Sequence, residues 1–107
     1  MERIVIVAYK PLTGKHKALE ELMLKHWKIL AGQKLVSDRQ PIIMKASDGT
    51  FIEVFGWRSA EAMGEAHSNP EVLKMWDEYA SVCEYVPIGS LEESNNLFSE
   101  FEPVNQP

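Results

Sequence analysis

The chain has 107 residues, of which 45% are hydrophobic and 25% charged, a balance typical of one globular domain spanning residues 1–107. Sixteen acidic residues against eleven basic ones give a formal net charge of -5. Because phosphate contacts need a basic surface, this charge argues against sequence-independent nucleic-acid binding. It also offers no basis for docking on an anionic membrane.

Cys83 is the one cysteine of the sequence, which excludes an intrachain disulfide and fits a reducing compartment. It follows a helical apolar face, so we expect a small buried core residue. The apolar run at residues 4–9 is too short for a secretory signal and far too short to span a bilayer. The expected location is cytoplasmic.

The first half of the chain predicts a strand, a helix and a hairpin. Residues 3–10 are rich in β-branched side chains on both faces, as in a central strand. Apolar residues recur every three or four positions over 15–31 and predict an amphipathic helix that stops at Gly32. Two strands, 41–46 and 51–57, flank Asp48-Gly49, a dipeptide typical of β-hairpin turns.

The second half predicts a broken helix, a strand and a tail. A helix over 60–66 stops at His67, and a second helix restarts at Pro70. Residues 84–91 predict a fourth strand, which Pro87 places at a sheet edge or a bulge. After a core of about 3–91 comes a tail, 92–107. Within it, residues 97–104 alternate weakly, which suits a short added strand or a contact with a second subunit.

The predicted order of elements is β-α-β-β-α-β. This order indicates a ferredoxin-like α+β fold, an antiparallel four-stranded sheet with the helices on one face. The helices leave the other face bare, yet the strands at 3–10 and 51–57 carry apolar residues on both faces. An exposed apolar face of that size is an association site. We therefore expect a homodimer that packs sheet face against sheet face.

One motif suggests a family. The run from Gly56 to Met63 (GWRSAEAM), followed by His67 and by Pro70-Glu71-Val72, resembles the dimeric α+β-barrel superfamily. Within it, the chain looks most like the antibiotic-biosynthesis-monooxygenase-type proteins, over roughly residues 3–91. The resemblance implies a dimeric barrel. It implies less about function, because the superfamily includes cofactor-independent monooxygenases, haem-degrading enzymes, isomerases and ligand-binding regulatory domains.

The same resemblance bears on cofactors. In the haem-degrading members, a tryptophan that ends the third strand lines the haem cleft, and Trp57 matches it. Their iron-binding histidine aligns with Asp77, and their first-strand asparagine with Val7, Ala8 or Tyr9, so haem degradation is not expected. The histidines are widely spaced and no glycine-rich phosphate loop occurs. We expect no cofactor and no metal.

His67 and Glu53 are the candidate catalytic residues. His67 stands at the helix break, where an imidazole suits a general base or a hydrogen-bond partner for a phenol or enolate. It equally suits a half-exposed helix cap. Glu53 is a carboxylate among apolar strand neighbours. An unpaired buried charge is costly, so Glu53 either faces a polar pocket or pairs with Lys45 across the hairpin.

Several more side chains are candidates for binding a ligand. His26 lies on the apolar face of the first helix and suits either a pocket or a hydrogen-bonded place in the core. Strand alternation puts Phe51, Glu53, Phe55 and Trp57 on one face. Aromatic side chains at these spacings suit a pocket wall or a plain core. The ligand-binding candidates are Trp57, Phe55, His26, Trp76, Tyr79 and Tyr9.

Two functions of different classes follow. In the first, each subunit of a homodimer binds a small aromatic or polyketide-like molecule in an apolar cleft. As an enzyme it resembles cofactor-independent monooxygenases, with His67 as the base, Glu53 or His26 tuning it, and Trp57 shaping the wall. The second is a non-enzymatic ligand-binding, regulatory or structural dimer. A Glu53 buried beside His67 or His26 in an open cleft favours the first, and an exposed Glu53 paired with Lys45 favours the second.

Overall fold

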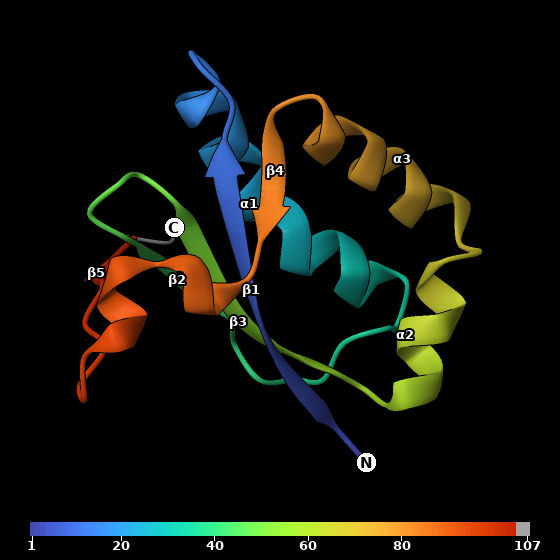
Figure 1. The fold of residues 1–107 in the computed structure, drawn as a ribbon. Helices are drawn as coiled ribbons and strands as arrows, with labels where there is room; N and C mark the ends of the chain where they lie inside the picture. The colour runs from blue at the N-terminus through green and yellow to red at the C-terminus, as the bar shows by residue number, and fades with distance from the viewer. Residues whose placement is uncertain (105–107) are drawn as a thin grey trace.

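A five-stranded antiparallel sheet and three α-helices make up the fold of residues 1–104, the part that this computed structural model describes (Figure 1). The strands run in the order β4-β1-β3-β2-β5 across the sheet. The elements are β1 Arg3–Pro11, α1 His16–Gly32, β2 Ile42–Lys45, β3 Phe51–Trp57, α2 Ala60–Ala66, α3 Pro70–Ala80, β4 Cys83–Val86 and β5 Glu102–Pro103, with short 3-10 turns η1 Ile88–Ser90 and η2 Glu92–Asn95.

The structure confirms an α+β fold but corrects the number of strands from four to five. The added strand, β5, pairs with β2, so that Met44 lies opposite Pro103 and Lys45 opposite Glu102. The strand expected over 84–91 is also shorter, because β4 ends at Val86. Pro87 follows at once and cannot donate a backbone hydrogen bond, and the chain then turns through η1 and η2. The prediction from sequence therefore overestimates the length of this strand.

The helices pack on one face of the sheet; in Figure 1, α1 runs behind β1 and β4, and α2 and α3 lie to the right of these strands. On this inner face the alternating residues of β1 and β3 meet the apolar sides of α1 and α3. Leu19, Met23 and Leu30 of α1 and Val72 of α3 are almost completely buried against them. The main core therefore lies between sheet and helices, and every inner-face side chain of β3 is buried in it: Phe51, Glu53, Phe55 and Trp57.

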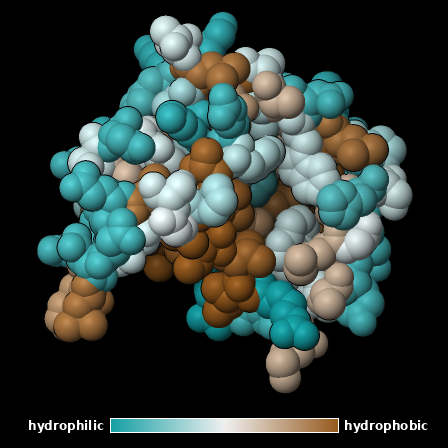
Figure 2. Space-filling view, in the orientation of Figure 1, coloured by the Kyte–Doolittle hydropathy of each residue, from teal (hydrophilic) through white to brown (hydrophobic). Residues whose placement is uncertain are grey.

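The opposite, outer face of the sheet is only partly covered. The segment after β4 folds back over it and buries a small cluster made of Ala8, Ala46, Ile52 and Leu91. Beyond this cover three isoleucines remain exposed: Ile4 at 54%, Ile6 at 55% and Ile42 at 56%. Figure 2 shows apolar surface gathered on this face. We call Ile4, Ile6 and Ile42 the outer patch.

Capping side chains explain where α2 and α3 begin. The Ser59 hydroxyl accepts a hydrogen bond from the backbone N–H of Ala62, as expected of a serine cap. The Asn69 side chain accepts hydrogen bonds from the backbone N–H groups of Glu71 and Val72, and Pro70 occupies the first helical position. His67 is the C-terminal cap of α2, so this break between two helices fixes its position.

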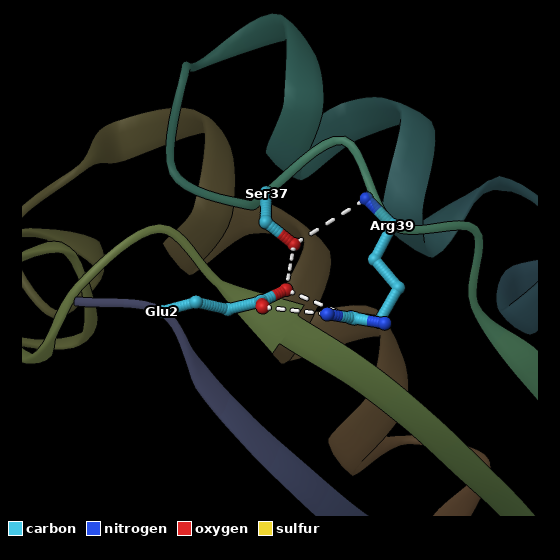
Figure 3. Close-up of polar contacts among 3 residues, drawn as sticks. All are labelled: Glu2, Ser37 and Arg39. Carbon is cyan, nitrogen blue, oxygen red and sulfur yellow. Dashed lines mark hydrogen bonds and ion pairs between the residues drawn. The ribbon is translucent and has the colours of Figure 1, made fainter.

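A polar cluster holds the N-terminus beside β3 (Figure 3). The Arg39 guanidinium donates to both Glu2 carboxylate oxygens, at 3.0 and 2.9 Å, and the Ser37 hydroxyl donates to Glu2 as well. A Cβ at Gly56 would collide with Glu2 and Ser37, so the close approach depends on a glycine there. The cluster thus joins the start of β1 to the loop between α1 and β2.

Replacing Glu2 by glutamine should change stability in a pH-dependent way. The hydrogen bond from Arg39, followed by that from Ser37, lowers the pKa of Glu2 from 4.5 to about 2. Because the folded pKa lies below the unfolded one, the carboxylate stabilises the fold above pH 4.5, and this contribution is lost as the pH falls toward 2. The difference in urea midpoint between the wild type and Glu2→Gln should therefore shrink over that range.

The matched control is Glu100→Gln, which changes an exposed carboxylate in the C-terminal segment. Its urea midpoint should stay close to that of the wild type at each pH. A Glu2→Gln difference that stays constant as the protein is acidified would show that the carboxylate charge does not contribute through Arg39 and Ser37.

Candidate functional site

A cavity of about 370 Å³ opens between the inner face of the sheet and the helices. Three strands, two helices and the end of α2 supply its walls, which are mostly apolar and aromatic. The lining residues are Val5, Val7, Tyr9, His26, Phe55, Trp57, His67, Trp76 and Tyr85. Five of the six predicted ligand-binding candidates thus share one cavity with His67.

The sixth predicted candidate, Tyr79, lies behind the cavity wall. Its side chain is completely buried and its ring stacks on Tyr9, with the centroids 5.2 Å apart. The ring of His26 meets Tyr79 edge to face at 5.4 Å. Tyr79 therefore supports two side chains of the cavity wall without lining the cavity itself.

Glu53 is completely buried at the middle of β3, directly behind the cavity wall. The Tyr9 hydroxyl donates a hydrogen bond to its Oε1 at 3.0 Å. Nδ1 of His26 lies 2.9 Å from the same oxygen. Lys45, the alternative partner considered from the sequence, lies opposite Phe51 in the hairpin register. The structure thus brings Glu53 together with Tyr9 and His26.

The contact between His26 and Glu53 is close but imperfectly directed. At 2.9 Å the two atoms are within ion-pair distance, yet the ring N–H is not aligned well enough to count as a hydrogen bond. The ring is held in place by Phe55, which it meets edge to face at 5.4 Å, and by Tyr79.

The tyrosines around the carboxylate stay protonated. Burial, and then the negative charge of Glu53, raise the pKa of Tyr9 well above 10. The same two causes raise the pKa of Tyr79. Burial first, with smaller effects of Cys83 and Glu53, raises the pKa of Tyr85 to about 12. These phenols therefore remain neutral near neutral pH and do not act as proton acceptors.

His67 faces the cavity from the other side. It is exposed, and its ring lies against that of Trp76 with the centroids 5.1 Å apart. On the sheet side, Phe55 and Trp57 pack against each other at 5.3 Å. Among residues 1–104, the side chains in contact with Glu53 through polar atoms are those of Tyr9 and His26, so His67 and Glu53 do not form a pair.

Three lining residues, Val5, Val7 and Tyr85, were missed by the sequence reasoning. The signal for the valines was present, because strand alternation from Tyr9 places them on the same face of β1. Tyr85 lies opposite Tyr9 in the pairing of β1 with β4. That register cannot be read from the sequence without knowing where β4 begins. Cys83, expected as a small core residue, is indeed buried, and burial raises the pKa of its thiol to about 11.

Residues 1–104 contain neither a metal-binding cluster nor a membrane-spanning helix. No three histidine, cysteine, aspartate or glutamate side chains gather there closely enough to hold a metal ion. None of the helices in that range has the length and apolar character needed to cross a lipid bilayer.

Comparisons of the chain with protein-family models, with curated proteins and with solved structures each find no match. Membership of the dimeric α+β-barrel superfamily therefore stays a prediction.

Replacing Tyr9 by phenylalanine should destabilise the fold, because the buried Glu53 carboxylate loses a donor. Leaving a buried acceptor without its partner costs about 1–3 kcal/mol. Tyr79→Phe is the matched control, since its buried hydroxyl has no hydrogen-bond partner among residues 1–104. We expect that variant to be neutral or slightly stabilised. Urea denaturation measures both, and equal midpoints for the two variants would contradict the donor role of Tyr9.

Proposed function

We propose that the protein binds a small aromatic or polyketide-like molecule in the cavity between its sheet and helices. The observation that carries the proposal is an apolar cavity of about 370 Å³ with two imidazoles in its wall and a buried carboxylate behind it. This volume lies within the roughly 300–1,000 Å³ of small-molecule sites. Aromatic walls with few polar groups suit a flat, weakly polar ligand.

The catalytic form of this proposal is a cofactor-independent monooxygenase. In such a reaction a base removes a proton from an activated phenolic substrate, and the resulting carbanion reacts directly with dioxygen. The substrate supplies the electrons, so that one oxygen atom enters the product and the other leaves as water. The wall offers two candidate bases, His26 and His67, and the fully buried Glu53 lies 2.9 Å from the first.

The alternative is a non-enzymatic ligand-binding, regulatory or structural dimer. One observation favours it: within residues 1–104 the polar partners of Glu53 are the internal side chains of Tyr9 and His26, and Glu53 does not itself line the cavity. A buried carboxylate held by a tyrosine and a histidine also serves as a polar anchor within a core. Ligand binding without turnover would support this alternative.

We further propose a ferredoxin-like core and a homodimer, as the family resemblance implies. In support, the four longer strands run β4-β1-β3-β2 and are antiparallel throughout, with the main core on one face. The outer patch leaves three isoleucines more than half exposed on the other face. A second copy of the chain, packed through the same face, would remove them from water.

A cavity-filling substitution tests the ligand proposal. Val7 lines the cavity, so Val7→Trp should occupy the space that a ligand needs. With 4-nitrophenol as the probe, calorimetry should show binding to the wild type and at least about tenfold weaker binding to this variant, a loss of about 1.4 kcal/mol. Leu97→Trp adds the same side chain at a position 94% exposed and should bind normally. Equal binding by both variants would place the probe elsewhere.

A charge on the outer patch tests the dimer. Ile6→Glu puts a carboxylate at a position that is 55% exposed in the single chain and that an interface would bury. Sedimentation velocity should show a dimer for the wild type and a monomer for this variant, because an unpaired buried charge is costly. Leu73→Glu, on α3 at 42% exposure, should stay dimeric. A monomeric wild type at micromolar concentration would exclude the dimer.

A further inference from the structure

We propose that His26, oriented by Glu53, is the proton acceptor of the cavity, and that the ligand is a small aromatic molecule with an acidic hydroxyl group. This inference rests on the proposed function, because it assigns the chemistry of the same cavity. From the sequence, His67 is expected to be the base, whereas the structure favours His26 on α1 for this role.

The geometry of the imidazole carries the assignment. Nδ1 of His26 lies 2.9 Å from Oε1 of Glu53, and the other ring nitrogen, separated from Nδ1 by one carbon, points in a different direction. The ring itself is part of the cavity wall. When Nδ1 carries the proton and directs it to the carboxylate, Nε2 has the lone pair. His26 therefore has one nitrogen for orientation and one for a ligand in the cavity.

The surroundings of His26 also favour a proton acceptor. The titratable side chains packed around it or across the cavity come from different elements: Glu53 on β3, Tyr9 on β1, Tyr79 on α3, Tyr85 on β4, and His67 at the end of α2. Glu53 is the one carboxyl side chain among them, and it lies at ion-pair distance from the ring. An imidazolium formed at His26 is thus stabilised by a buried carboxylate at ion-pair distance.

Glu53 has the properties of a positioning residue. It is completely buried, so water does not compete for its Oε1, and the Tyr9 hydroxyl holds the same oxygen at 3.0 Å. Tyr9 cannot take the proton itself, because its pKa is raised well above its usual value by burial and by Glu53. The carboxylate, itself held by the Tyr9 hydroxyl, lies at ion-pair distance from the imidazole and does not line the cavity.

In the described part of the chain, His67 has no comparable neighbours to orient its ring. Its side chain is exposed, and its ring contact is with Trp76. No carboxylate within residues 1–104 forms an ion pair with it. An exposed imidazole without an orienting partner suits a role in binding the ligand at the mouth of the cavity.

The proposed step is a simple proton transfer. The aromatic hydroxyl of the ligand gives its proton to Nε2 of His26, which leaves a phenolate in the cavity and an imidazolium whose Nδ1–H points to Glu53. No electron is transferred, and one positive and one negative charge appear together. The proton returns to the ligand or passes to solvent when the product leaves.

The test uses the full-length protein with 4-nitrophenol, whose phenolate is coloured and whose neutral form is not. Calorimetry measures binding, and absorbance measures the ionised fraction of the bound probe at a pH where the free probe is mostly neutral. The wild type should increase the ionised fraction. His26→Gln should bind the probe within about threefold of the wild type but lower the ratio of ionised to neutral probe about tenfold, the equivalent of one pKa unit.

Two further variants separate the roles of the neighbours. Glu53→Gln keeps the shape and can still accept from Tyr9, but it removes the charge, so the ionised ratio should fall while binding persists. His67→Gln should weaken binding but keep the ionised ratio of the probe that is bound, whereas His16→Gln, at a residue outside the cavity wall, should keep both. Circular dichroism checks that each variant is folded. Ionisation that survives in His26→Gln, or that is lost only in His67→Gln, would overturn the assignment.

A spectroscopic measurement on the wild type makes the test independent of variant folding. On addition of the probe, the 15N signal of His26 Nε2 should move to the position of a protonated nitrogen, with His16→Gln and His67→Gln spectra assigning the other two histidines. Binding with an unchanged His26 signal would refute the role of His26 as proton acceptor. The proposal that the cavity binds a small aromatic molecule would stand. Absence of any 4-nitrophenol binding would instead contradict the proposed binding function.

Discussion

The middle of the sheet has to accommodate a carboxylate. Glu53 sits at the centre of β3, the strand that pairs with both β1 and β2, and none of its surface is exposed. A charge at such a position is tolerated only with partners, and here β1 and α1 supply them through Tyr9 and His26. The packing of α1 on the sheet and the composition of the cavity wall both depend on that single side chain.

Strand alternation divides the molecule into two faces with different tasks. The inner residues of β1 and β3 build the core and the cavity, whereas their outer neighbours lie under the C-terminal segment or remain exposed. A shift of β3 by one residue would move Glu53 to the outer face and remove the aromatic wall. The register Val7–Glu53 between β1 and β3 therefore determines the inner site and the outer patch together.

The sequence predicted the elements well where the local signals were strong. The Asp48-Gly49 turn, the restart of a helix at Pro70 and the alternation of residues 51–57 are local patterns, and the structure contains all of them. Contacts between segments that are distant in the sequence were harder to predict. Tyr85 reaches the cavity, and residues 102–103 add a strand, only because β4 and β5 pair in particular registers. Glu53 was identified as unusual, but its partner on α1 depends on how the helix packs against the sheet.

The two edges of the sheet limit how copies of this chain can meet. β5 is two residues long and contains Pro103, and β4 has four residues before Pro87 ends it. Short outer strands with nearby prolines offer few unpaired backbone groups to an incoming strand. Extension of the sheet from molecule to molecule, the route to fibrous aggregates, is therefore disfavoured along β4 and β5, whereas residues 3–7 of β1, which β4 does not pair with, leave part of one edge open.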